Sequence, residues 1–179
     1  IPVIIHRSGF TGENGFEIYC DMNDSAAVKE AIRDTCEVHS APELTILEVY
    51  VRSLPVEKGF ALRQDIYLMT PYECGLEWSV DLSKDFIGRD ALVKAKEEGP
   101  KWVLVGLEYL AESYEDIAQM EIVYHKGVPC GRVKAAIYGY TVDKNIGYAV
   151  IDARKAIIGR AVTVGCNNSP AVIVKKGWI

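Results

Sequence analysis

The first twenty residues alternate between apolar runs and a glycine-rich segment. Residues 2–6 form an apolar, β-branched run that is typical of a strand. Residues 8–15 carry three glycines at three-residue spacing and predict a tight loop. Residues 16–20 return to a strand-like pattern. The segment therefore predicts two strands joined by a glycine loop.

Helical spacing follows this pair of strands. Asn23 and Asp24 are favoured helix N-caps, and one apolar stripe with charges opposite predicts a helix after them. The stripe consists of Val28, Ala31, Ile32 and Thr35. A second helix is expected from Ile46, ended or kinked at Pro55 and closed by Gly59. Its apolar face is formed by Leu47, Val51 and Leu54.

The rhythm changes near residue 100. Residues 88–98 predict a helix that turns Ala91, Leu92 and Ala95 inward and stops at Gly99. Beyond it, short strand-like runs are separated by turn residues, and residues 125–128 predict a hairpin tip. The runs are 103–107, 121–124, 132–140, 146–151, 161–164 and 171–174. The expected fold class is α+β, with an α+β region over residues 1–99 and a small antiparallel β-barrel or sandwich over residues 100–179.

Composition and charge exclude several classes to which the protein could belong. The chain of 179 residues is 49% hydrophobic and 25% charged, with a formal net charge of −5, which is ordinary for a globular protein. That balance argues against nucleic acid as a partner, and no apolar stretch is long enough to span a membrane. Five widely spaced cysteines without a C-x-x-C pair predict reduced, mostly buried thiols, no metal site and a cytoplasmic location. Because the chain opens on an apolar strand without Met, we expect a later part of a longer protein.

Several sites are considered and set aside. The glycine loop leads into a strand, not a helix N-terminus, so it does not predict phosphate binding. Residues 21–32 begin like a calcium loop but lack its glycine and final glutamate. Nothing in the sequence ties Ser8, Ser40 or a cysteine to a histidine, so no nucleophile is predicted.

Glu17 is the most informative polar residue. Period-two alternation places it opposite Phe16 and Ile18, on a face that either meets solvent or lines a cavity. In a cavity, its carboxylate suits an amino-pyrimidine edge or a guanidinium. Phe10 and Trp78 are then candidate aromatic walls, although core packing is the ordinary role of a tryptophan such as Trp78.

Six segments resemble the glycine cleavage T-protein (aminomethyltransferase) family. Residues 7–18, R-S-G-F-T-G-E-N-G-F-E-I, resemble that family's R-T-G-Y-T-G-E-D-G-F-E-I signature, and residues 57–60, E-K-G-F, resemble its E-A-G or E-K-G element. Residues 71–78 and 86–92 match two further elements in order, and residues 138–149 and 170–173 fit its C-terminal barrel. The E-K-G-F and Y-x-Y-T-x-x-K forms are similar to relatives fused in dimethylglycine and sarcosine dehydrogenases.

The resemblance implies partial folate-binding aminomethyltransferase domains followed by the barrel. It implies tetrahydrofolate as cofactor, with Glu17 on the pterin edge, Phe10 beside it and Trp78 in the pocket wall. Arg52 is the counterpart of a folate-contacting arginine, although the A-R-D-S-L-R context of the family is offset by one here. The family's catalytic aspartate lies upstream of the glycine motif, so this chain is expected to carry no catalytic residue of its own.

The expected function is the C-terminal portion of a tetrahydrofolate-dependent aminomethyl or methyl transferase. Its partners would be a small one-carbon donor or a carrier protein, and the missing N-terminal half of the same chain. A non-catalytic folate-binding or interaction module is the alternative. The iron–sulfur assembly relatives carry a reactive cysteine in K-G-C-Y-x-G-Q-E, and residues 58–65 here contain none.

Overall fold

The structure is a computed structural model that describes residues 1–44, 46–115 and 117–179, without the side chains of residues 46–48 and 50. Contacts divide the chain into two compact units, Ile1–Pro55 and Val56–Ile179, called unit 1 and unit 2 below. The sequence predicts a domain boundary between residues 99 and 100 from the change in type of structure. Division by contacts does not test that boundary, which stays a prediction. Each unit is described by itself.

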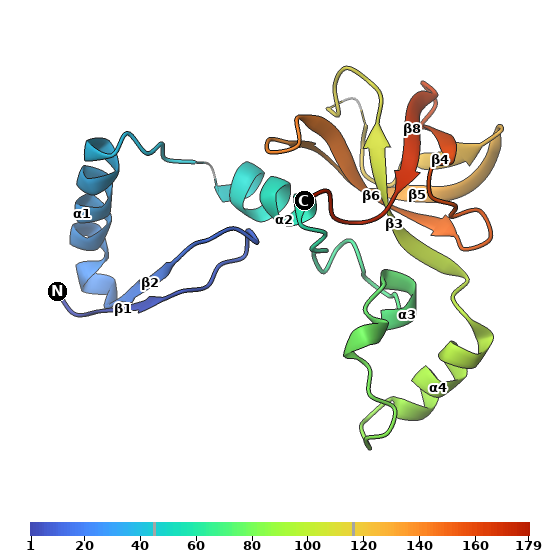
Figure 1. Cartoon of the computed structure of the whole chain (residues 1–179), viewed down its shortest axis with the longest axis horizontal. Helices are drawn as coiled ribbons and strands as arrows, with labels where there is room; N and C mark the ends of the chain where they lie inside the picture. The colour runs from blue at the N-terminus through green and yellow to red at the C-terminus, as the bar shows by residue number, and fades with distance from the viewer. Residues whose placement is uncertain (45, 116) are drawn as a thin grey trace. The chain divides into compact units, whose positions relative to one another are not determined.

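Unit 1 begins with the predicted pair of strands. Strands β1 (Val3–His6) and β2 (Glu17–Cys20) are antiparallel, and their register pairs His6 with Glu17. The glycine loop connects them, as the sequence predicts (Figure 1). The first residues of the chain therefore form a two-stranded sheet with Glu17 at the start of its second strand.

One helix lies beside this sheet. A 3₁₀ turn, η1 (Met22–Asp24), leads into helix α1 (Ser25–Val38). Asp24 occupies the N-cap position of α1, as expected, but its side chain makes no cap hydrogen bond. The side chain that caps is Asp21, which precedes η1 and accepts a hydrogen bond from the Asn23 N–H at 2.9 Å. The predicted stripe of α1 lines an open groove with Val3 and Ile18, so the helix faces the side of the sheet opposite Glu17.

The second predicted helix has two parts. Residues Ile46–Ser53 form a π-helix, η2, and Leu54–Glu57 form a short α-helix, α2. Pro55 therefore lies just after the change of helix type, where the backbone hydrogen-bond pattern is already interrupted. Gly59, at φ +86°, closes the segment as predicted. The side chain of Leu47, assigned to the apolar face, lies outside the described residues.

Short helices precede the barrel in unit 2. They are α3 (Pro71–Cys74), the 3₁₀ turn η3 (Glu77–Ser79) and α4 (Arg89–Glu98). Helix α4 begins one residue after the predicted start, with Gly88 as its N-cap, and ends at Glu98 as predicted. Its apolar face is not buried: Leu92 and Ala95 are half-buried and Ala91 is exposed. The amphipathic pattern was right about the helix and wrong about its burial.

The predicted six strands close into an antiparallel barrel (Figure 1). The strands are β3 (Trp102–Tyr109), β4 (Ile122–His125), β5 (Val128–Gly139), β6 (Lys144–Asp152), β7 (Ala161–Val164) and β8 (Ser169–Val174). Their order around the barrel is β3-β6-β5-β4-β7-β8. His125 pairs with Val128 across Lys126 and Gly127, which both have positive φ, so the predicted hairpin tip is confirmed.

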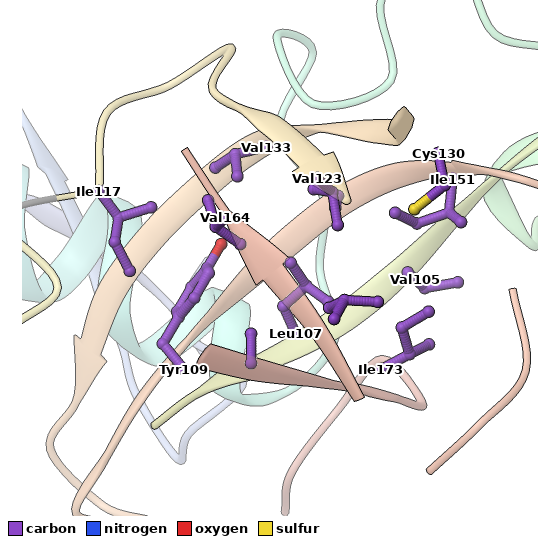
Figure 2. Close-up of a cluster of buried hydrophobic side chains, with 13 residues drawn as sticks. Val105, Leu107, Tyr109, Ile117, Val123, Cys130, Val133, Ile151, Val164 and Ile173 are labelled. Carbon is purple, nitrogen blue, oxygen red and sulfur yellow. The ribbon is translucent and has the colours of Figure 1, made fainter. Parts of the chain in front are cut away.

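Two apolar clusters cover opposite faces of the barrel wall. The inner cluster includes Val105, Leu107 and Ile173, whose side chains converge inside the barrel (Figure 2). The outer cluster combines Leu104 and Tyr148 of the wall with residues of the segment before the barrel, such as Val56 and Cys74. Strand β5 has a register shift between Val133 and Ala135. Because of this shift, the Val133 side chain joins the inner cluster and the Ala135 side chain joins the outer one.

The cysteines are less buried than predicted. Cys74 and Cys130 are buried, Cys20 and Cys36 are half-buried, and Cys166 is exposed. Cysteine behaves as a small apolar residue, so its burial depends on which surface covers it, which spacing does not reveal. Across the described residues, no helix is long and apolar enough to cross a bilayer.

Candidate functional site

Glu17 lies on the open face of the two-stranded sheet. Its side chain is 36% exposed and shares that face with Tyr19, two residues along β2, and with its cross-strand partner His6. Ile18 points the other way, toward the groove with α1. Glu17 therefore faces away from the apolar groove of unit 1, as the alternation predicts.

Two hydroxyl groups converge on one oxygen of this carboxylate. Ser8 Oγ donates to Glu17 Oε2 at 2.7 Å, and Tyr19 Oη donates to the same atom at 2.9 Å. His6 Nδ1 lies 3.9 Å from Oε2 and 2.8 Å from Ser8 Oγ. We call these four residues, His6, Ser8, Glu17 and Tyr19, the Glu17 cluster.

The cluster holds Glu17 as a carboxylate. The pKa of Glu17 lies below its ordinary value because Ser8 and then Tyr19 donate hydrogen bonds to the charged form, with a smaller contribution from His6. Within the described residues no donor reaches Oε1. Glu17 is thus an ionised, oriented acceptor with one oxygen available to a ligand.

The other predicted residues of unit 1 differ in exposure. Phe10, in the glycine loop, is 38% exposed and presents part of an aromatic ring. Arg52, near the end of η2, is half-buried, and its buried Nη1 has no hydrogen-bond partner within the described residues. A buried guanidinium nitrogen usually has a partner, so Nη1 is an exception among the described residues.

Trp78 belongs to unit 2 and is not a core residue. It lies in η3 and is 80% exposed, which excludes the core packing that its residue type suggested. Its predicted role in a pocket wall stays a prediction. An exposed indole of this size is available for stacking on a flat ring.

The motif before Trp78 has a structural explanation. Thr70 is the N-cap of α3, and Glu73 returns a hydrogen bond to the Thr70 N–H at 2.9 Å in a capping box. Gly75 ends the helix in the left-handed conformation, at φ 70°. The P-x-E-x-G-L element therefore specifies a short helix that positions η3.

Sequence reasoning missed two polar groups. Ser8 contacts a histidine after all, with its Oγ 2.8 Å from His6 Nδ1, but its hydroxyl donates to Glu17. Glu57, quoted only as part of the E-K-G-F element, is fully buried in unit 2. Its Oε1 accepts from the Thr141 N–H at 2.7 Å, which ties the segment before the barrel to the β5–β6 hairpin.

The described residues contain no group of three or more His, Cys, Asp or Glu side chains placed to hold a metal ion. The Glu17 cluster offers a carboxylate that accepts hydrogen bonds and lies beside the aromatic ring of Tyr19. That pair of features suits a flat ligand that carries N–H donors on one edge.

Comparison with a solved structure shows the fold. The chain matches the crystal structure of glycine cleavage system aminomethyltransferase T from Bartonella henselae with a TM-score of 0.81. The match covers 96% of this chain and 48% of that chain at 24% identity, so it shows the fold. The fold is that of an aminomethyltransferase with a C-terminal barrel.

Family comparisons then identify the chain. The GCVT N-terminal domain matches residues 1–84, and the glycine cleavage T-protein C-terminal barrel domain matches residues 103–178. The chain belongs to the glycine cleavage T-protein family, which confirms the resemblance of its motifs.

Named relatives support the same assignment. The aminomethyltransferase of Listeria monocytogenes serotype 4b is 36% identical over 94% of this chain, and that of Caldanaerobacter subterraneus subsp. tengcongensis is 34% identical over 99%. The matches cover 45% and 48% of those proteins, so the chain spans about half their length. A trimethylamine-oxide aldolase of Ruegeria pomeroyi is 30% identical over 92% of this chain, which covers 21% of that protein.

Proposed function

We propose that this chain is part of a tetrahydrofolate-dependent one-carbon transferase and supplies the edge of its folate pocket. The observation that carries the proposal is the Glu17 carboxylate, held by hydrogen bonds on Oε2 and open at Oε1. The family signature around it and the relatives named aminomethyltransferase support the same function.

The residues of the chain fit a reduced pterin ring. An amino-pyrimidine edge presents N–H donors, and an ionised carboxylate accepts them in charge-assisted hydrogen bonds. Glu17 meets this requirement because its lowered pKa keeps it charged. Phe10, Trp78 and Arg52 are the proposed additional contacts, the first two through their exposed rings and Arg52 through its half-buried guanidinium.

The role of this part of the protein is to bind and orient tetrahydrofolate. Tetrahydrofolate supplies the nitrogen nucleophile that receives the one-carbon unit, whereas the chain's own residues hold the pterin edge. The proposed catalytic aspartate belongs to the half of the family fold that this chain does not span. The proposed partners are that other half and a small one-carbon donor or a carrier protein.

The test is a titration of tetrahydrofolate, kept reduced under nitrogen, into the ¹⁵N-labelled chain followed by NMR. We expect saturable shifts at the amides around Glu17, and a loss of affinity of roughly tenfold or more in Glu17→Gln because the charge-assisted contact becomes neutral. Glu13→Gln removes a carboxylate of the glycine loop that precedes β2 and should bind like the unchanged protein.

Two outcomes of the titration would contradict the proposal. Equal affinity in Glu17→Gln and Glu13→Gln would remove Glu17 from the folate pocket. An absence of shifts at millimolar ligand would favour the alternative, in which the chain keeps the family fold as an interaction module without folate.

A further inference from the structure

We propose that Ser8 and Tyr19 position the Glu17 carboxylate, by holding Oε2 so that Oε1 becomes the principal acceptor for the N–H donors of the ligand. The inference rests on the proposed function and adds two residues to the folate-binding edge. Neither was predicted from the sequence, because each matters only through its contact with Glu17.

The geometry of the two donors carries the proposal. Ser8 lies in the loop after β1 and Tyr19 lies in β2, so they approach Glu17 from different segments. Their hydroxyls donate to the same oxygen at 2.7 and 2.9 Å. An oxygen that already accepts two hydrogen bonds has little acceptor capacity left, whereas Oε1 keeps both of its lone pairs.

The two hydrogen bonds also reduce the cost of binding. A half-exposed glutamate samples several rotamers, and fixing one of them on binding costs conformational entropy. Ser8 and Tyr19 fix that conformation before the ligand arrives, so less of this cost falls on the binding step. They also hold the pKa of Glu17 down, which keeps the acceptor charged under mildly acidic conditions.

The groups that face Glu17 are few in unit 1. They are Ser8, Tyr19 and His6, whose Nδ1 lies 3.9 Å from Oε2. Because a histidine charge also changes with pH, pH profiles are compared in the His6→Gln background. Changes in the profile then report on Glu17 and its two hydroxyl partners.

The test compares Ser8→Ala and Tyr19→Phe with Thr35→Val as the matched control. Thr35 Oγ1 donates to the Ala31 carbonyl within α1, so its removal deletes a hydroxyl of unit 1 outside the cluster. We expect each cluster substitution to weaken tetrahydrofolate binding about three- to tenfold. The control should leave binding unchanged.

Two readouts separate positioning from a general structural effect. The first is the acid limb of the binding profile, whose midpoint should move to higher pH in Ser8→Ala because the Glu17 pKa returns toward its ordinary value. The second is a ¹³C NMR titration of the Glu17 carboxyl without ligand, which should show the same shift. Unchanged affinity, or an unchanged midpoint in both readouts, would overturn the proposal.

The carboxyl titration also separates this inference from the proposed function. If the unchanged chain does not bind tetrahydrofolate, the proposed function fails. If Ser8→Ala and Tyr19→Phe leave the Glu17 carboxyl titration unaltered, the positioning role fails independently of any ligand.

Discussion

The two units differ most in how they treat their apolar side chains. In unit 2, Leu107, Ile151 and Ile173 are fully buried inside the barrel. In unit 1, Ile4 and Ile5 are 70% and 61% exposed, and no residue of β1, β2 or α1 is buried. Burial of apolar area is the dominant favourable contribution to folding, so burial stabilises unit 2 more than unit 1. The Glu17 cluster lies in the unit that buries least, as is common for binding residues.

The largest expected contrast between the units comes from adding one methyl group to a glycine. In Gly147→Ala, the new Cβ would lie 1.9 Å from the Ala135 carbonyl oxygen of the neighbouring strand, so the backbone of β6 must move. We expect a loss of about 3 kcal/mol or more in the free energy of unfolding of unit 2.

Gly9→Ala is the matched substitution in unit 1. A Cβ at Gly9 meets nothing within 4 Å, so its effect on stability should stay within about 0.5 kcal/mol. Urea denaturation of both variants measures the two values. Equal losses would show that the glycine loop is as tightly packed as the barrel.

A cavity in the barrel should have the next largest effect. Leu107 lies in β3, which pairs with β6 and β8, and its side chain is fully buried. Leu107→Ala should lower the free energy of unfolding by about 2–5 kcal/mol. Ile4→Ala removes an aliphatic side chain from the exposed face of β1 and should change stability by less than about 1 kcal/mol. A loss at Ile4 close to that at Leu107 would show that the β1–β2 sheet is covered in solution.

Thiol labelling sharpens the same contrast without a substitution. Burial raises the pKa of the Cys74 and Cys130 thiols, and a buried thiol reacts only when its surroundings open. Cys20 and Cys36 of unit 1 are half-buried and should react with an aromatic disulfide reagent roughly a hundredfold faster. Mass spectrometry of labelled peptides gives the rates. Similar rates at Cys36 and Cys130 would contradict the assigned burial.

The smallest expected effect is on the acid stability of unit 2. Hydrogen bonds from Arg154 lower the pKa of Asp152 from 3.8 to about 2. Because the folded value lies below the unfolded one, the contribution of this pair is present above pH 4 and is lost as the pH falls through about 2. Arg154→Ala should raise the Asp152 pKa in an NMR titration. It should leave the Glu17 titration in unit 1 unchanged, and a shift there would contradict the independence of the two carboxylates.

Much of the barrel could be predicted, because its information is local. Short strand-like runs separated by turn residues identified the six strands, and residues 125–128 identified a hairpin tip. The two apolar faces of β6 were harder to predict, because Ile146 and Tyr148 are buried only where the segment before the barrel covers them. The same limit explains α4, whose amphipathic pattern indicated a buried face that the structure leaves partly exposed.

For the candidate site, the sequence by itself determined that Glu17 lies opposite Ile18 and follows a glycine loop, because a strand alternates with a fixed period of two. Only the tertiary structure brought Ser8, nine residues away, to Glu17 Oε2 and placed His6 beside both. It alone placed Trp78 on the surface and Glu57 in the core. Periodicity specifies the face on which a side chain lies, whereas its neighbours depend on segments that are distant in the chain and meet only on folding.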